Sequence, residues 1–224
     1  MRSVLLLSLL TLLTPCSRSR AETRYYFLLF AYQGTSRKPS LGHSIGTFVK
    51  VRHEKDRCEI LHAHTISWLP ETLNVRLKAI LPEKGRNLGL EESLDLALKL
   101  NARIWLWGPF EIKEKLYERS CRQIKKLESG KVKYKAFDFI LPTSTCSNCV
   151  HALSDLALML PRPRVLAFSW GKKGSYRVLR RLRWFVVDLL KTHDWLIDAL
   201  NLRRYPLIRV SATEKVGLLP IPIK

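Results

Sequence analysis

The sequence is short of acidic side chains. Its 224 residues include 39 lysines and arginines but only 19 aspartates and glutamates, so the formal net charge is +20. A surplus of this size favours encounters with anionic partners such as nucleic acid, acidic envelope polymers and membrane headgroups. Charge alone does not choose among these partners, and a solvated basic surface would give the same balance.

Long apolar runs are also missing. The longest at the N-terminus, residues 4–13, has about half of the roughly 20 residues that a membrane-spanning helix requires. It follows Arg2 and is followed by a small-x-small site at residues 19–21, which together predict a cleavable signal peptide over residues 1–21. Cys16 follows a proline, which is a poor match to a lipoprotein cleavage box.

We therefore expect an exported protein, periplasmic or extracellular, whose residues 22–224 form a single domain. Export counts against a nucleic-acid partner and favours an anionic envelope component. The segment 176–184 alternates arginines with apolar residues and could lie on an anionic membrane surface. The interpretation we favour is a packed helix whose core-facing residues are Val178, Leu179, Leu182 and Phe185.

Hydrophobic patterning predicts an α+β fold, with an antiparallel sheet packed against helices. Runs rich in β-branched and aromatic residues indicate strands, and leucines at helical spacing between charges indicate helices. The expected strands are residues 25–32, 43–51, 58–69, 74–81, 103–107, 133–140, 165–170 and 207–211. The expected helices are residues 90–101, 111–128, 150–160, 176–190 and 193–200, of which the last two form a C-terminal extension, and residues 82–87 are expected to turn.

Cysteine is scarce. Besides Cys16 there are only Cys58, Cys121, Cys146 and Cys149, which could form disulfides in three pairings outside the cytosol. Cys149 lies where a polar turn opens into an apolar helical segment, and the free N–H groups of a helix start favour a thiolate. It is therefore the candidate nucleophile.

Histidines that could serve this nucleophile occur on two expected strands. A cysteine hydrolase needs a base to take the thiol proton and a third group to orient that base. His43 begins one strand and is the candidate base. His62 and His64 share one face of the next strand, with His64 the preferred orienting group and His62 the reserve.

The order of these segments resembles the circularly permuted papain-like fold, which includes the lecithin:retinol acyltransferase-like and NlpC-type enzymes. The histidine strand matches Gly42-His43-Ser44, the second strand matches His64-Thr65-Ile66-Ser67-Trp68-Leu69-Pro70, and the nucleophile turn matches Asn148-Cys149-Val150-His151-Ala152-Leu153. The same segments, with Trp107-Gly108-Pro109-Phe110-Glu111, are similar to a family of exported bacterial proteins. The resemblance covers most of residues 22–224.

This resemblance implies a cysteine-dependent amide or ester hydrolase or acyltransferase that uses Cys149, His43 and His64 without a cofactor. Its partner would be an acyl- or peptide-bearing substrate. Cys146 departs from the family pattern, because nothing in that pattern asks for a second cysteine three residues before the nucleophile. A member of the fold that binds but does not catalyse also fits the sequence.

Two other chemistries remain open for the cysteine turn. Cys146 and Cys149 form a C-x-x-C at a helix start, as in thioredoxin-like proteins, where Cys146 would be the attacking thiol. The proline loop that such proteins carry some forty residues onward is not found here. A metal site is disfavoured although His151 lies close to both cysteines, because there is no second C-x-x-C and no typical zinc-ligand spacing. The sequence does not indicate an oligomeric state.

Overall fold

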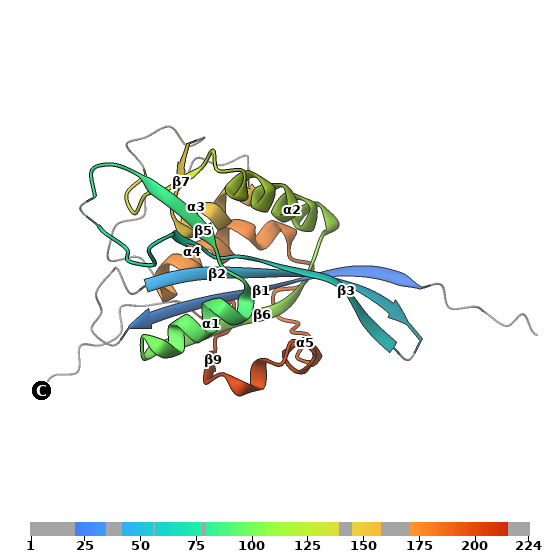
Figure 1. The fold of residues 1–224 in the computed structure, drawn as a ribbon. Coiled ribbons are helices and arrows are strands. Elements are labelled where there is room, and N and C mark those ends of the chain that lie inside the picture. The colour runs from blue at the N-terminus through green and yellow to red at the C-terminus, as the bar shows by residue number, and fades with distance from the viewer. Residues whose placement is uncertain are drawn as a thin grey trace, which may run out of the picture.

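The computed structural model describes residues 21–34, 42–55, 57–77, 79–138, 145–157 and 171–214. Two sheets and a set of helices make up this part of the chain (Figure 1). The mixed α+β class expected from the sequence is confirmed. The predicted signal peptide and the expected strand at residues 165–170 lie outside the described residues, apart from residue 21.

The larger sheet contains the long N-terminal strands. Its order is β3-β2-β1-β6-β9, and all neighbours are antiparallel except β6 and β9. The expected strands at residues 25–32, 43–51 and 103–107 fall within it, and the one expected at residues 207–211 is a strand only over Leu207–Arg209. The strands are β1 (Glu22–Gly34), β2 (Gly42–Glu54), β3 (Arg57–Ile66), β6 (Ala102–Ile112) and β9 (Leu207–Arg209).

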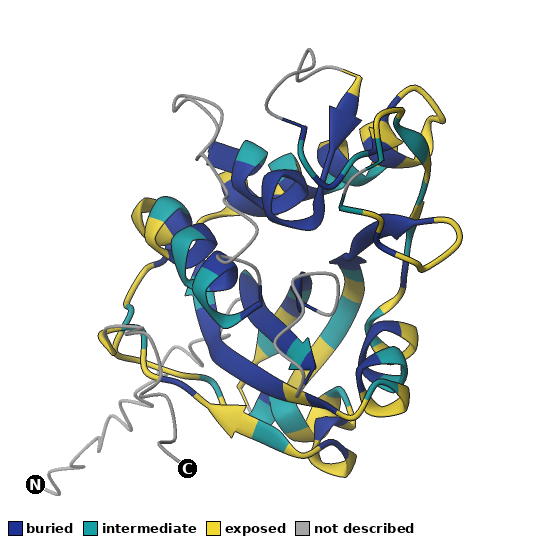
Figure 2. Ribbon diagram, turned by 90° about the vertical axis from the view of Figure 1, so that its left-hand side faces the viewer, coloured by how far each residue is buried: buried dark blue, intermediate teal, exposed yellow. Residues whose placement is uncertain are grey.

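Both faces of the larger sheet are covered by helices. Alternate residues of β1 belong to two separate hydrophobic clusters, with Phe27 and Leu29 on one face and Leu28 and Phe30 on the other. A sheet covered on both faces needs continuous rather than alternating hydrophobic runs, which explains the sequence of β1. In Figure 2 the centre of the molecule is dark blue, because β1 and most of β2 are buried, whereas much of β3 is exposed.

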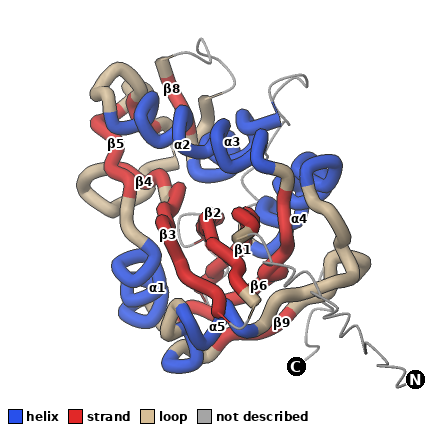
Figure 3. The backbone as a smooth tube through the Cα atoms, turned by 90° about the vertical axis from the view of Figure 1, so that its right-hand side faces the viewer, coloured by secondary structure: helices blue, strands red, loops and turns tan. Residues whose placement is uncertain are grey.

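The face that carries Phe27 and Leu29 is covered by α2, α3 and α4. The face that carries Leu28 and Phe30 is covered by α1 and the C-terminal segment (Figure 3). Each helix has an apolar stripe that faces the sheet. The helices are α1 (Leu90–Lys99), α2 (Glu114–Glu128), α3 (Cys149–Ser154), α4 (Lys172–Leu182) and α5 (Trp195–Ala199), with 3-10 turns at Asp155–Ala157, Arg183–Phe185 and Leu202–Arg204. No helix in the described ranges is long and apolar enough to cross a membrane.

A smaller sheet joins the larger one where the chain leaves β3. After Ile66 the chain passes Ser67 and enters β4 (Trp68–Pro70), so the expected strand at residues 58–69 is divided between two sheets. The order of the smaller sheet is β4-β5-β7-β8, and only β7 and β8 are parallel. Its other strands are β5 (Glu83–Asn87), β7 (Lys133–Tyr134) and β8 (Cys146–Ser147).

Two expectations were wrong between β4 and β5. Residues 74–77 and 79–81 form no strand. The loop contains Leu73 at a positive φ of 58°, and Ile80 and Leu81 are exposed. The expected turn at residues 82–87 is instead mostly strand β5. Its polar sequence has little strand propensity, and pairing with β4 and β7 determines its conformation.

Helix lengths differ from expectation near the C-terminus. The expected helix over residues 176–190 begins at Lys172, and its α-helical part ends at Leu182. Its Val178, Leu179 and Leu182 are buried, as the packed-helix interpretation required, and Phe185 is half-buried against the same core. The predicted strand over residues 133–140 pairs only at Lys133–Tyr134 within the residues described there.

Candidate active site

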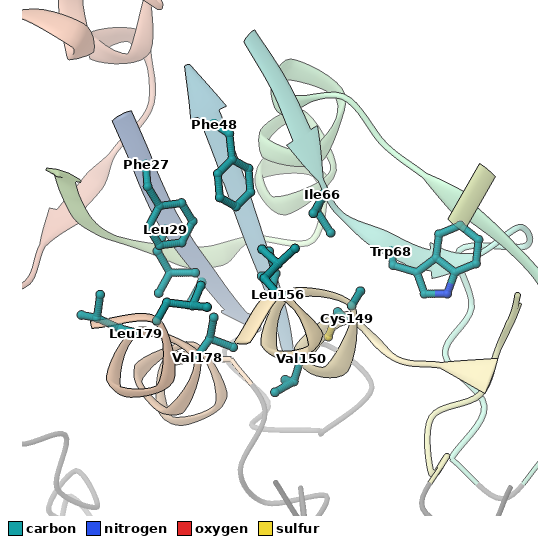
Figure 4. Close-up of a cluster of buried hydrophobic side chains, with 14 of the residues drawn as sticks. Phe27, Leu29, Phe48, Ile66, Trp68, Cys149, Val150, Leu156, Val178 and Leu179 are labelled. Atoms are coloured by element: carbon teal, nitrogen blue, oxygen red, sulfur yellow. The ribbon is translucent and has the colours of Figure 1, made fainter. Parts of the chain in front are cut away.

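Cys149 is the first residue of α3, as the turn-to-helix pattern predicted. Asn148 is the N-cap of this helix, and its side-chain oxygen accepts the backbone N–H of His151 at 2.9 Å. The helix packs closely on β2: a Cβ at Gly46 would lie 2.5 Å from Leu153 Cδ2. Glycine at this position lets α3 approach the strand, and Figure 4 shows Cys149 at the start of the helix near Ile66.

The sulfur of Cys149 lies against β2 and is nearly buried, with 2% of the residue exposed. The backbone N–H groups of Ser44, Val150 and Cys149 itself lie near it. These donors favour the thiolate, but the cost of desolvating a charge is larger, and burial raises the pKa of the Cys149 thiol to about 11. The expectation that the helix start would favour a thiolate was therefore wrong for the resting protein.

His43 precedes Ser44 on β2, and it too is buried. Its Nε2 lies 2.9 Å from Ser67 Oγ, and its Nδ1 is buried without a hydrogen-bond partner. Burial lowers the pKa of the imidazole to about 3, so the ring is neutral at physiological pH. Cys149 packs on the α3 face of the sheet, whereas the His43 ring leaves β2 on the opposite face, beside Tyr32, and both groups are uncharged.

A chain of hydroxyls reaches the His43 ring. Ser93 Oγ lies 2.6 Å from the Gly89 carbonyl oxygen and donates to Ser67 Oγ at 2.8 Å. Ser67 Oγ in turn lies 2.9 Å from His43 Nε2, and His43 Nδ1 has no partner. In the tautomer whose Nε2–H donates to Ser67, the lone pair of Nδ1 can accept a proton.

The structure does not bring His64 to His43. His64 stacks on Phe48, whose side chain belongs to the α2 and α3 side of the sheet, with ring centroids 5.5 Å apart. The His64 ring nitrogens lie 2.7 Å from Ser120 Oγ and 3.4 Å from His62 Nδ1. Because His43 is at an odd position of β2 and Phe48 at an even one, their side chains leave the strand on opposite faces. Ser67 occupies the position expected for His64.

His62 and Cys146 also lie apart from the His43 ring. His62 Nδ1 is 2.7 Å from the hydroxyl of Tyr117 on α2. Cys146 is buried on β8, with its sulfur 3.9 Å from Thr145 Oγ1. All four cysteines of the described ranges are free, so none of the three disulfide pairings is formed there.

A buried ion pair that the sequence did not reveal supports the start of α3. His151 Nδ1 lies 2.6 Å from Asp138 Oδ1, and Asn148 Nδ2 donates to the same oxygen at 3.0 Å. All three side chains are at most 2% exposed. The spacing of Asn148 and His151 is that of a helix cap and could have been recognised, but nothing local marks Asp138. Asn148 therefore has a capping role.

A metal site is not apparent in these ranges, because no three or more His, Cys, Asp or Glu side chains of the described residues are arranged to hold an ion. Comparison of the chain with protein-family models, curated proteins and solved structures gives no match. The candidate site offers the thiol of Cys149 at a helix start and a neutral imidazole, that of His43, with one ring nitrogen that has no partner.

Proposed function

We propose that this protein is an exported cysteine-dependent hydrolase or acyltransferase with a permuted papain-like fold. Cys149 is the nucleophile, His43 the base, and Ser67 the group that orients His43. One observation carries the proposal: Cys149 begins the helix that packs on β2, and His43 of the same strand has a buried ring nitrogen with no partner. An unsatisfied buried polar atom is costly, and the proton of the Cys149 thiol would satisfy it once the ring turns toward the sulfur at the start of β2.

The neutral resting pair defines the order of events. As Sγ attacks a carbonyl carbon, its proton passes to His43 Nδ1, and the carbonyl oxygen becomes an oxyanion. Backbone N–H groups at the start of α3 stabilise this charge. The imidazolium then returns the proton to the leaving amine or alkoxide, and a thioester remains on Cys149. Water hydrolyses the thioester, or a second nucleophile accepts the acyl group.

The ion pair beneath α3 fits this assignment, because a nucleophile must be held within a fraction of an ångström of its productive position. Asp138 and His151 fix the cap of the helix that begins with Cys149. Since Cys149 is only 2% exposed, the packing around the sulfur must open before a substrate can reach it. The substrate class that we propose is an acyl- or peptide-bearing component of the cell envelope.

The proposal is tested by acylation with p-nitrophenyl acetate followed by peptide mapping. We expect an acetyl group on Cys149 that does not form in Cys149→Ser and forms at least about 100-fold more slowly in His43→Ala. Ser67→Ala should slow acylation about tenfold while folding normally, because the ring loses only its orienting contact.

Cys146→Ser is the matched control and should acylate normally. Acetylation that does not depend on Cys149 or His43 would refute the proposal. A disulfide between Cys146 and Cys149 in the protein isolated without reductant would favour redox chemistry instead. Tight binding of an acyl or peptide ligand with no turnover would identify a binding protein of the same fold.

A further inference from the structure

A second thiol, far along the sheet from Cys149, has its own histidine. We propose that Cys58 is a site of reversible thiolation, activated by His53 and Tyr26, and that it reacts with low-molecular-weight disulfides bearing both ammonium and carboxylate groups. This site is independent of the proposed acyl-transfer function. It lies at the outer end of the β2–β3 hairpin, which extends beyond the helices in Figure 1.

Cys58 and His53 face each other across the hairpin. They are paired residues of the two strands, and Cys58 Sγ lies 3.2 Å from His53 Nδ1. The opposite ring nitrogen, Nε2, lies 2.7 Å from the hydroxyl of Tyr26, whose side chain is fully buried in β1. The tyrosine fixes the ring, and the ring holds its other nitrogen against an exposed sulfur.

This geometry gives the Cys58 thiol a base, since burial and the nearby Arg24 lower the pKa of the His53 imidazole and favour its neutral form. When Cys58 gives its proton to His53 Nδ1, the imidazolium donates Nδ1–H to the sulfur and Nε2–H to the Tyr26 oxygen, so both of its protons have acceptors. A thiolate beside a protonated histidine is the reactive form in thiol chemistry. The arrangement is a nucleophile, a base and an orienting group, as at Cys149, but here the nucleophile is open to solvent.

The other described cysteines lack this combination. Cys146 and Cys149 are buried. Cys121 is half-buried and lies 4.0 Å from His64 Nε2, but that nitrogen is 2.7 Å from Ser120. The Ser120 hydroxyl donates to a backbone carbonyl, so Ser120 accepts the Nε2 proton of His64, and this nitrogen has no lone pair for a thiol proton. Cys121 is therefore a suitable internal comparison.

The surroundings of Cys58 indicate the class of reagent. A hollow beside the sulfur is lined by two guanidinium and two carboxylate groups, from Arg52, Arg57, Glu54 and Glu59. Arg52 and Glu59 pair with each other at 3.1 Å. A small zwitterionic disulfide presents complementary charges to such a hollow, whereas an apolar reagent would gain nothing from it.

The reaction balances without another oxidant. The Cys58 thiolate attacks one sulfur of the disulfide, a new sulfur–sulfur bond forms, and the original bond breaks. One half of the reagent stays on Cys58 as a mixed disulfide, and the other half leaves as a thiolate that takes the proton from His53. An excess of small thiol reverses the step.

The test uses the full chain with oxidised glutathione as the probe, an acid quench, and peptide mapping of each cysteine over time. We expect Cys58 to be modified at least about tenfold faster than Cys121, and His53→Gln to slow Cys58 about tenfold. His62→Gln is the control, because it removes a histidine of β3, the strand of Cys58, that contacts Tyr117 rather than Cys58.

The reagent class is tested separately with the uncharged 2-hydroxyethyl disulfide. Arg57→Ala should slow the reaction of Cys58 with oxidised glutathione about threefold or more and leave the reaction with the uncharged reagent unchanged. If His53→Gln reacts at the wild-type rate, or if Cys121 reacts as fast as Cys58, simple exposure explains the reactivity and the proposal fails. His53 is at the exposed end of the hairpin, so thermal melting of His53→Gln should match that of the wild type and show that the fold is intact.

Discussion

Alkylation of Cys149 by iodoacetamide should depend on pH as a buried neutral thiol does. Burial raises the pKa of this thiol to about 11, so below that value the thiolate fraction falls tenfold with each unit of pH. At pH 7 about one molecule in 10⁴ carries the thiolate, compared with about 3% for an unperturbed cysteine of pKa about 8.5. The charge effect alone therefore predicts an alkylation rate about 300-fold below that of an ordinary thiol.

The assay follows Cys149 by peptide mapping between about pH 6 and pH 9, with free cysteine alkylated in the same buffers as the unperturbed comparison. Restricted access lowers the Cys149 rate equally at every pH, so a rate that still rises tenfold per unit up to pH 9, where that of free cysteine levels off, shows the raised pKa. His43→Ala should leave this slope unchanged, because burial lowers the pKa of the His43 imidazole to about 3 and the ring carries no proton to stabilise a thiolate. A plateau of rapid Cys149 alkylation below pH 8 that disappears in His43→Ala would show a resting ion pair and refute this reasoning.

Two further predictions concern stability in urea denaturation. Asp138→Ala should lower the free energy of unfolding by about 3 kcal/mol, because it removes a buried acceptor that His151 and Asn148 share. Asp198→Ala on the surface should leave the midpoint nearly unchanged, and equal effects of the two substitutions would contradict a structural role for the buried pair. Gly85→Ala should lower the free energy of unfolding by about 1–3 kcal/mol, because the new Cβ would lie 1.9 Å from Trp68 Cζ2. Gly89→Ala is the control: no atom lies within 4 Å of its Cβ, so the free energy of unfolding should change by less than about 0.5 kcal/mol. A tolerated Gly85→Ala would mean that the indole ring moves freely.

Local pattern was sufficient for the long elements and for the position of Cys149. The strands near residues 25–32 and 43–51 and helix α2 follow from hydrophobic periodicity, which reflects burial directly. The position of Cys149 at a helix start followed from a polar turn before an apolar segment. These features depend on residues within one or two turns of each other, so they can be predicted from short stretches of the sequence.

Other parts of the site depend on contacts between distant segments. β5 is a polar pentapeptide that forms a strand because β4 and β7 flank it. Ser67, rather than His64, contacts His43 because β3 leaves the larger sheet just before it. No local sequence pattern predicts the residue at which a strand passes from one sheet to another. The same holds for Asp138, which is thirteen residues before its histidine partner.

The division of the site between two sheets has a consequence for how the protein folds. His43 belongs to the larger sheet, whereas Cys149 follows directly from a strand of the smaller one, 106 residues later in the chain (149 − 43). Contacts between such distant segments form late, because the loop between them must first be closed. A partly folded chain with either sheet alone would hold a thiol or an imidazole but not the pair. Reactivity would therefore appear only when the whole chain has assembled.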